Sequence, residues 1–491
     1  MLKYLLLQYM ANNKNIPDIN VTSEIGTLRR VLVHTPDGGL GKVVPSKAQD
    51  WLFEDIVHLE TIRRDEYDYY TKLLLYFLDE KKIKGRLNII DDAKKGRSFY
   101  KPEHADFFKS DKVVEWQSLL SDILEDETIK AKLVASVCAI ENCSYLIQKD
   151  LLNLQPLQLA KVFITGSLPD KTMIFPPVPN LIFTRDIGIV VKDHIILNKP
   201  ARAARIREAL LTKYIFFNHR LFASYQHKVI ELEDIHRHFL MPDSDDRRVT
   251  LEGGDVMVVS KNHLLIGVSE RTSMEAAQQV IKIIFEKNLM KKVSVIKIPR
   301  KRDYMHIDTI FTQVKKDMWV MLGNFSRKTI RHENSDPVQR ILELNGKEDG
   351  LAITQFHKNK ISEPVYFDNL EDLLTDVSKN DLGCKNRISF IYSGNNQFPF
   401  DVREQWTDSC NLLALKESVV LGYDRNNKTA EAFKEHGFTV TGVKEIINSI
   451  EKGDVVVDDI KDTLILFPSA ELSRARGGFH CMSMPLLRDE L

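Results

Sequence analysis

The stretch IGIVVKDHIILN, residues 187–198, contains two short apolar runs separated by a charged turn. Short runs rich in Ile and Val are typical of buried β-strands. Helical patterns such as EAAQQVIKIIFEKN (275–288) and KTAEAFKEHG (428–437) separate several further runs of this kind. Strands that alternate with helices predict an α/β fold. The further apolar runs lie at residues 256–260, 263–268, 293–298, 318–323, 418–423, 454–459 and 464–468.

The many short strands favour small repeated βαβ-like modules over one doubly wound sheet. TLRRVLVHTP (27–36) predicts a first strand, and residues 51–82 have apolar positions at helical spacing. Residues 83–172 differ, because a polar, interrupted segment is followed by helix-like sequence. We therefore expect a helical insertion at 83–172 within an α/β part formed by 1–82 and 173–491.

Composition limits the classes of partner that the chain can have. The chain has 491 residues, and its 69 Lys and Arg residues balance 69 Asp and Glu residues. A net charge of zero argues against nucleic acid or a membrane surface recognised by bulk charge. The five cysteines are sparse and irregularly spaced, and this favours a reducing, cytoplasmic compartment over a disulfide framework. No apolar run is long enough to predict a transmembrane helix. The apolar MLKYLLLQYM (1–10) is interpreted as a surface or packing segment rather than a signal peptide.

Four polar clusters punctuate the predicted strands: PNLIFTRD (179–186), LEGGD (251–255), MHID (305–308) and RGGFHC (476–481). Each has an ordinary structural interpretation when it is taken alone. His306 and Asp308 at i and i+2 would lie on one face of a strand as a hydrogen-bonded pair. Cys481 could be a small buried hydrophobe. Together, however, the clusters supply a thiol, a histidine and several carboxylates.

The charges around the thiol indicate a cationic substrate. Carboxylates beside a cysteine raise the pKa of the thiol and disfavour the thiolate nucleophile. The arrangement becomes productive if the substrate brings a positive charge. A guanidinium group is a planar cation whose N–H donors match two carboxylates. We therefore expect covalent cysteine chemistry on a guanidinium compound.

In this order, the clusters resemble the guanidine-modifying superfamily, and arginine deiminase in particular. Further stretches that carry the resemblance are IGTLRRVLVHTP, PARAAR, GVSERTS, MHIDTIFTQV, REQWTDSCN and CMSMPLLRD. The resemblance covers nearly the whole chain. It implies a five-bladed α/β propeller of the pentein type, built from repeated ββαβ modules around a central site, with a helical insertion after the first module.

The resemblance also implies roles for individual residues. Cys481 would be the nucleophile that attacks the guanidinium carbon, and His306 would be the general acid and base. Glu252 would hold guanidinium nitrogens and orient His306. Asp186 and Asp308 would bind the remaining guanidinium donors.

A second set of residues would bind the α-carboxylate of the substrate. Arg271 and Arg476 match carboxylate-binding arginines of the family, and Asn180 matches an asparagine that assists them. The third arginine lies in PARAAR, where we expect Arg202, with Arg205 as the alternative.

The resemblance thus implies hydrolysis of free L-arginine to L-citrulline and ammonia, without a metal or an organic cofactor. Three alternatives remain open. They are amidino transfer to an amine, hydrolysis of agmatine or a methylated arginine, and arginine binding without catalysis. The expected partner is a small molecule, and homo-oligomerisation is open.

Overall fold

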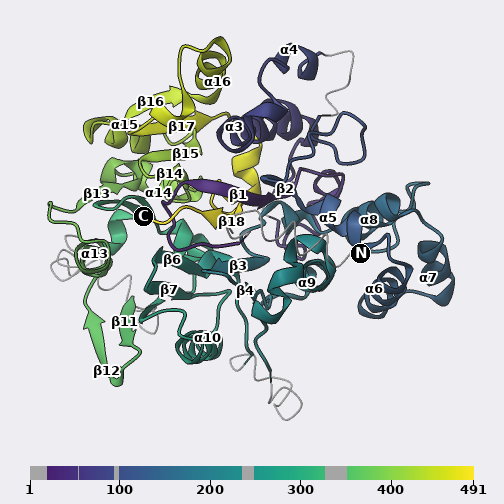
Figure 1. Ribbon diagram of the computed structural model, residues 1–491, viewed down its shortest axis with the longest axis horizontal. Coiled ribbons are helices and arrows are strands. Elements are labelled where there is room, and N and C mark those ends of the chain that lie inside the picture. Colours follow the sequence, from purple (N-terminus) through teal and green to yellow (C-terminus); the bar gives the residue numbers. More distant parts are fainter. Residues whose placement is uncertain (1–18, 54, 93–98, 235–247, 327–350) are drawn as a thin grey trace, which may run out of the picture.

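The computed structural model describes residues 19–53, 55–92, 99–234, 248–326 and 351–491. The predicted packing segment at residues 1–10 lies outside these ranges. Within them the strands form five separate sheets, and the architecture is α/β, as the sequence predicts. In Figure 1, β1 (Leu28–Val33) and β18 (Met484–Arg488), from opposite ends of the chain, lie side by side in the middle of the molecule.

The remaining strands assemble into the sheets as follows. β1 and β18 are joined by β2 (Val113–Glu115); a second sheet holds β3 (Gly188–Val191), β4 (His194–Leu197) and β5 (Val229–Ile230). The largest sheet holds β6 (Val256–Ser260), β7 (His263–Val268), β8 (Lys292–Lys297), β11 (Ala352–His357) and β12 (Lys360–Phe367). The last two hold β9 (Phe311–Lys315), β10 (Met318–Met321) and β13 (Ser389–Tyr392), and β14 (Leu413–Lys416), β15 (Val419–Tyr423), β16 (Thr439–Gly442) and β17 (Thr463–Phe467).

The five sheets repeat one pattern of pairing. In each, a middle strand pairs antiparallel with one neighbour and in parallel with the other. The middle strand is β7 in β6–β7–β8 and β4 in β3–β4–β5. The same order occurs in β9–β10–β13, β14–β15–β17 and β18–β1–β2. A parallel pair needs a crossover connection, and helices supply it. The repeated modules expected from the short apolar runs are therefore present.

Helices cover the sheets and lie mostly toward the outside of the molecule in Figure 1. Those in the crossovers are α2 (Leu59–Thr61), α3 (Tyr67–Leu78), α4 (Leu87–Ile90), α9 (Ile206–Asn218), α10 (Met274–Glu286), α13 (Leu370–Asp376), α15 (Asn427–Glu435) and α16 (Val443–Lys452). The others are α5 (Trp116–Ile123), α6 (Glu127–Ile140), α7 (Tyr145–Leu152), α8 (Pro156–Thr165) and α14 (Phe400–Trp406).

The core consists of three hydrophobic clusters. The first packs α5, α6, α8, α9 and α10 against β3, β4, β6 and β7, and the second joins α3, β1 and β15 to the segment around Cys481. The third lies between β9, β10, α13 and α15. Because Cys481 belongs to the second cluster, the segment that carries it is held in the core rather than at the surface.

Two details differ from the sequence-based expectations. The predicted helical insertion contains α5 to α8, but β2 at its centre pairs in parallel with β1 and belongs to a sheet. The division into two domains stays a prediction. DVVVDD (454–459) contains a 3-10 turn at Val457–Asp459 instead of a strand, and Lys416 Nζ donates to the carbonyl oxygens of Val457 and Asp458 in this turn. No helix among the described residues combines the length and the apolar character that a bilayer crossing needs.

Candidate active site

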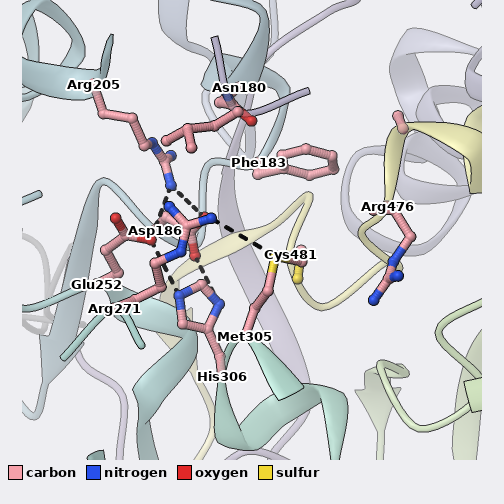
Figure 2. A pocket seen from close by; sticks show the side chains of 12 residues that line it. Asn180, Phe183, Asp186, Arg205, Glu252, Arg271, Met305, His306, Arg476 and Cys481 are labelled. Atoms are coloured by element: carbon pink, nitrogen blue, oxygen red, sulfur yellow. Dashed lines mark hydrogen bonds and ion pairs between the residues drawn. The ribbon is translucent and has the colours of Figure 1, made fainter. Parts of the chain in front are cut away.

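A pocket lies where the loops that lead into the first strands of the sheets meet (Figure 2). Asp186 precedes β3, Glu252 precedes β6, His306 precedes β9 and Cys481 precedes β18. The repeated module therefore brings together residues that are far apart in the sequence. The pocket is lined by Leu52, Asn180, Phe183, Asp186, Arg205, Glu252, Arg271, Met305, His306, Ala475, Arg476 and Cys481.

Two glycines let Glu252 and His306 approach each other. A Cβ atom on Gly253 would lie 2.0 Å from the carbonyl oxygen of Arg185, and one on Gly254 would lie 2.5 Å from Nδ1 of His306. Real Cβ atoms do not come this close, so both positions require glycine. The LEGGD motif is thus explained by close packing of Gly253 against the backbone of Arg185 and of Gly254 against the ring of His306.

The His306 ring lies between two carboxylates. Its Nε2 is 3.1 Å from Oε2 of Glu252, and its Nδ1 is 3.8 Å from Oδ1 of Asp186. Burial lowers the pKa of His306, but Asp186 and Glu252 outweigh burial and raise it to about 10. The ring is therefore an imidazolium at neutral pH and can act as an acid. The sequence pattern predicts a strand at His306, but the structure differs. His306 caps a 3-10 turn (Ile307–Thr309), and the N–H of Ile307 donates to Oδ1 of Asp255.

The guanidinium group of Arg205 lies between the same carboxylates. Its Nη1 donates to Oδ2 of Asp186 at 2.7 Å and to Oε2 of Glu252 at 3.2 Å, while its Nε donates to Glu208 at 3.0 Å. Burial alone would raise the pKa of Glu252, whereas Arg205 and His306 hold it below its usual range. Arg202, the residue expected in the pocket, is instead 54% exposed and pairs with Glu270. The pocket contains Arg205, the alternative from the same motif.

The Cys481 loop is packed too tightly for larger residues. A Cβ atom on Gly477 would lie 2.3 Å from the ring of Phe183, and one on Gly478 would lie 2.4 Å from the carbonyl oxygen of Asn411. The N–H of Cys481 donates to Oδ1 of Asn411 at 2.9 Å, and Nδ2 of Asn411 donates to the carbonyl oxygen of Asp308 at 3.2 Å. Asn411 thus fixes the thiol relative to Asp308.

The Cys481 thiol is protonated in this environment. Its Sγ donates to Oδ2 of Asp308 at 3.7 Å. Burial raises the pKa of Cys481 well above its usual value, and the charges of Asp308 and Asp186 raise it further. A thiolate therefore requires an additional positive charge beside the sulfur.

A buried polar network supports Asp308 at Oδ2, the oxygen that also accepts from the Cys481 thiol. Nδ1 of His480 is 2.8 Å from Oδ2 of Asp308, and its Nε2 is 3.1 Å from Glu24. Glu24 in turn accepts from Arg185 at 2.9 Å. Burial raises the pKa of Asp308, but the hydrogen bond from His480 outweighs it and keeps this pKa below its usual value.

Arg271 and Arg476 also line the pocket, and Arg271 lies close enough to the carboxylate pair for its charge to lower the pKa of Glu252. Arg271 contacts the sulfur of Met305 at 4.0 Å, and Arg476 lies apart from the group around His306 in Figure 2. Among the described residues, Nε and Nη1 of Arg476 are buried and have no hydrogen-bond partner. Nδ2 of Asn180 donates to the carbonyl oxygen of Trp51 at 2.6 Å. The pocket therefore has carboxylates surrounded by Arg205, Arg271 and His306, and a separate cationic group, Arg476, at another part of its wall.

Asp186, Glu252 and His306 also meet the spacing that a metal site needs. In the part of the chain that the structure describes, their donor atoms lie within 4.8 Å of one another. However, a cationic guanidinium group already bonds to both carboxylates. The trio is therefore suited to a planar organic cation.

A family model described as arginine deiminase matches residues 130–488. The chain belongs to the arginine deiminase family. Its curated relatives include the arginine deiminases of Oenococcus oeni, 30% identical, and of Borrelia garinii, 28% identical; the alignments cover 96% of this chain and 98% of each relative. The arginine deiminase of Bacillus cereus strain B4264 is 30% identical over 96% of this chain and 99% of its own length.

Solved structures add a more distant likeness to this member of the arginine deiminase family. An amidinotransferase of saxitoxin biosynthesis from Microseira wollei is 13% identical, with a TM-score of 0.44 over 97% of this chain and 98% of its own. The N-terminal domain of a cyanobacterial arginine dihydrolase, ArgZ, is 13% identical, with a TM-score of 0.35 over 63% of this chain and 76% of its own. Scores this low carry no conclusion about function.

Sequence reasoning missed several residues of the site. Glu24 lies in a polar stretch without a motif, and its contact with His480 joins positions 456 residues apart. His480 lies within RGGFHC and Asn411 ends REQWTDSCN. Their position next to other motif residues is the one sequence feature that could have marked them as part of the site. The sequence does not show that Asn411 contacts Cys481 and Asp308, because these residues lie in different stretches of the chain.

Proposed function

We propose that the protein hydrolyses free L-arginine to L-citrulline and ammonia through a covalent S-alkylthiouronium intermediate on Cys481. The observation that carries the proposal is the guanidinium of Arg205 bound by Asp186 and Glu252. The chain's own arginine thus demonstrates that these carboxylates accept a planar guanidinium group. In addition, among the described residues, one buried oxygen each of Asp186, Glu252 and Asp308 has no hydrogen-bond partner and can accept from a second guanidinium.

In the first half of the reaction, the substrate cation activates the thiol. Its positive charge offsets the carboxylates that keep Cys481 protonated, so the thiol releases its proton by way of Asp308, to which Sγ donates, and the thiolate then attacks the guanidinium carbon. The C–N bond to one terminal nitrogen breaks as that nitrogen takes the proton of the His306 imidazolium. Ammonia leaves, and a C–S bond holds the amidino carbon on the enzyme.

In the second half, the same histidine has the opposite role. His306 has lost its proton, so the neutral ring can accept one from water. The hydroxide attacks the amidino carbon, the C–S bond breaks, the hydroxyl proton returns to the sulfur of Cys481, and L-citrulline leaves. Glu252, which is 3.1 Å from Nε2 of His306, keeps the ring oriented through both steps.

The arginines of the pocket favour an amino acid as the substrate. Arg271 and Arg476 would bind the α-carboxylate, since Arg476 has buried N–H groups without a partner among the described residues. Arg205, rather than Arg202, would be the third arginine near the substrate. Agmatine lacks the carboxylate that these arginines would bind.

Two further parts of the proposal concern the fold and the setting. We place the five sheets as blades of an α/β propeller around the pocket, because the loops before β3, β6, β9 and β18 all reach it. The five free cysteines support a reducing, cytoplasmic compartment.

The decisive experiment is to incubate purified protein with L-arginine and to assay citrulline and ammonia together. We expect equal release of both. Consumption of arginine without citrulline, or transfer of the amidino group to added glycine, would replace hydrolysis by amidino transfer. Binding of arginine in calorimetry without any turnover would contradict a catalytic role.

A further inference from the structure

The pocket-lining Arg476 is held by the face of an aromatic ring. Its guanidinium carbon lies 3.7 Å from the centroid of the Trp406 ring. Trp406 is the last residue of α14 and is 46% exposed, whereas Arg476 is only 4% exposed. The indole therefore covers the arginine, which is buried beneath a partly exposed ring.

This contact leaves the polar edge of Arg476 available. An arginine paired with a carboxylate uses its in-plane N–H groups for that partner. A cation–π contact instead uses the flat face of the guanidinium. Nε and Nη1 of Arg476 are buried and make no hydrogen bond within the described ranges. The charge is thus partly compensated while its donors are kept for a ligand.

The backbone of Arg476 also needs support from its surroundings. Its φ of 59° and ψ of 90° are unusual for a residue with a side chain. Strained backbone conformations of this kind persist when the surrounding structure fixes them. Arg476 follows the 3-10 turn Leu472–Ala475, and its N–H donates to the carbonyl oxygen of Ser473 at a long 3.3 Å. The Trp406 ring fixes the other end of the residue.

We propose that Trp406 is a positioning residue for substrate binding: its ring holds the Arg476 guanidinium so that the free N–H edge meets the α-carboxylate of the substrate. This inference rests on the proposed function, in which Arg476 binds that carboxylate. Trp406 does not line the pocket itself and acts through Arg476. Because the carboxylate takes no part in bond breaking, the ring affects binding of substrate and transition state alike.

The test is steady-state kinetics with L-arginine for Trp406→Leu and Trp406→Phe. Leucine keeps an apolar side chain without a π face, and we expect KM to rise roughly 3- to 30-fold, the range of a lost cation–π contact. The value of kcat should stay within about twofold, because uniform binding is lost. Phenylalanine should retain most of the wild-type KM, since it keeps a ring.

A matched control lies on the same helix. Phe400, the first residue of α14, has Lys428 at 5.7 Å from its ring, but this pair does not line the pocket. Phe400→Leu removes an aromatic–cation contact from α14 and should leave KM unchanged. An equal rise in KM would show that any damage to α14 has this effect, and would overturn the proposal.

A double-mutant cycle gives a second, independent readout. Once Arg476→Gln has removed the charge, Trp406→Leu should cause no further rise in KM. Additive effects of the two substitutions would overturn the proposal, as would a Trp406→Leu enzyme with wild-type KM. These results differ from failure of the proposed function, in which the wild-type protein would release no citrulline from L-arginine.

Discussion

At the scale of single residues, the site depends on charges that are wrong for a free thiolate and right for a bound cation. Asp186 and Asp308 disfavour ionisation of Cys481, and the same carboxylates fit a guanidinium group. His306 is protonated for the same reason, with a pKa raised to about 10. The carboxylates around the site thus keep His306 protonated, and they make ionisation of the Cys481 thiol depend on the positive charge of the substrate.

The first residue-scale prediction concerns Cys481. Cys481→Ala should abolish citrulline release and retain arginine binding in calorimetry, because the carboxylates and the arginines of the pocket remain. In the substrate-free wild-type protein, thiolate absorbance near 240 nm, taken as the difference from Cys481→Ala, should be absent at pH 8. Residual turnover in Cys481→Ala would disprove the covalent route, and a thiolate signal at pH 8 would disprove activation by substrate.

At the scale of elements, the end of β1 is joined to its neighbours by a buried histidine. Nδ1 of His34 is 3.0 Å from Glu115 on β2, and its Nε2 is 2.8 Å from Asp37 in the following loop. Burial lowers the pKa of His34, but the hydrogen bonds with Asp37 and Glu115 raise it to about 9. The protonated His34 ring therefore links the end of β1 to β2 through Glu115 and to the following loop through Asp37.

This ion cluster predicts a pH dependence of stability. Since the folded pKa of about 9 exceeds the ordinary value of 6.5, the contribution is complete below pH 6.5 and is lost as the pH rises through 9. It amounts to roughly 3 kcal/mol at most, at 1.36 kcal/mol for each pKa unit. Denaturant unfolding of wild type and His34→Gln at pH 6, 7.5 and 9 measures it. The stability difference between the two should shrink with rising pH; a constant difference would refute the assignment.

At the scale of the whole molecule, the last strand closes the first sheet. β18 pairs antiparallel with β1 (Figure 1), and the buried Arg488 donates from Nη1 to the carbonyl oxygen of Gly26 at 2.7 Å. The sheet that contains β1 is therefore complete only when the end of the chain is paired with its beginning. This pairing also positions Cys481, three residues before β18 begins.

The corresponding prediction uses two deletions. Removal of residues 484–491 takes away β18 and the buried Met484 and Leu486, so cooperative thermal unfolding followed by circular dichroism should be lost. Removal of Glu490 and Leu491, which lie beyond the strand and are exposed, should leave the melting temperature nearly unchanged. A cooperative transition in the longer deletion would show that the first sheet is stable without β18.

The sequence by itself determined the α/β class, the strand β1 and eight of the later strands, namely β3, β4, β6, β7, β8, β10, β15 and β17, and it indicated the residue types of the pocket. Short apolar runs and the polar motifs that follow them are local patterns, so they can be recognised in the sequence without knowledge of tertiary contacts. The tertiary structure decided that Arg205 rather than Arg202 enters the pocket, that His306 caps a turn, and that Glu24, Asn411 and Trp406 support the reactive groups. These assignments depend on contacts between loops tens to hundreds of residues apart, which no local pattern encodes.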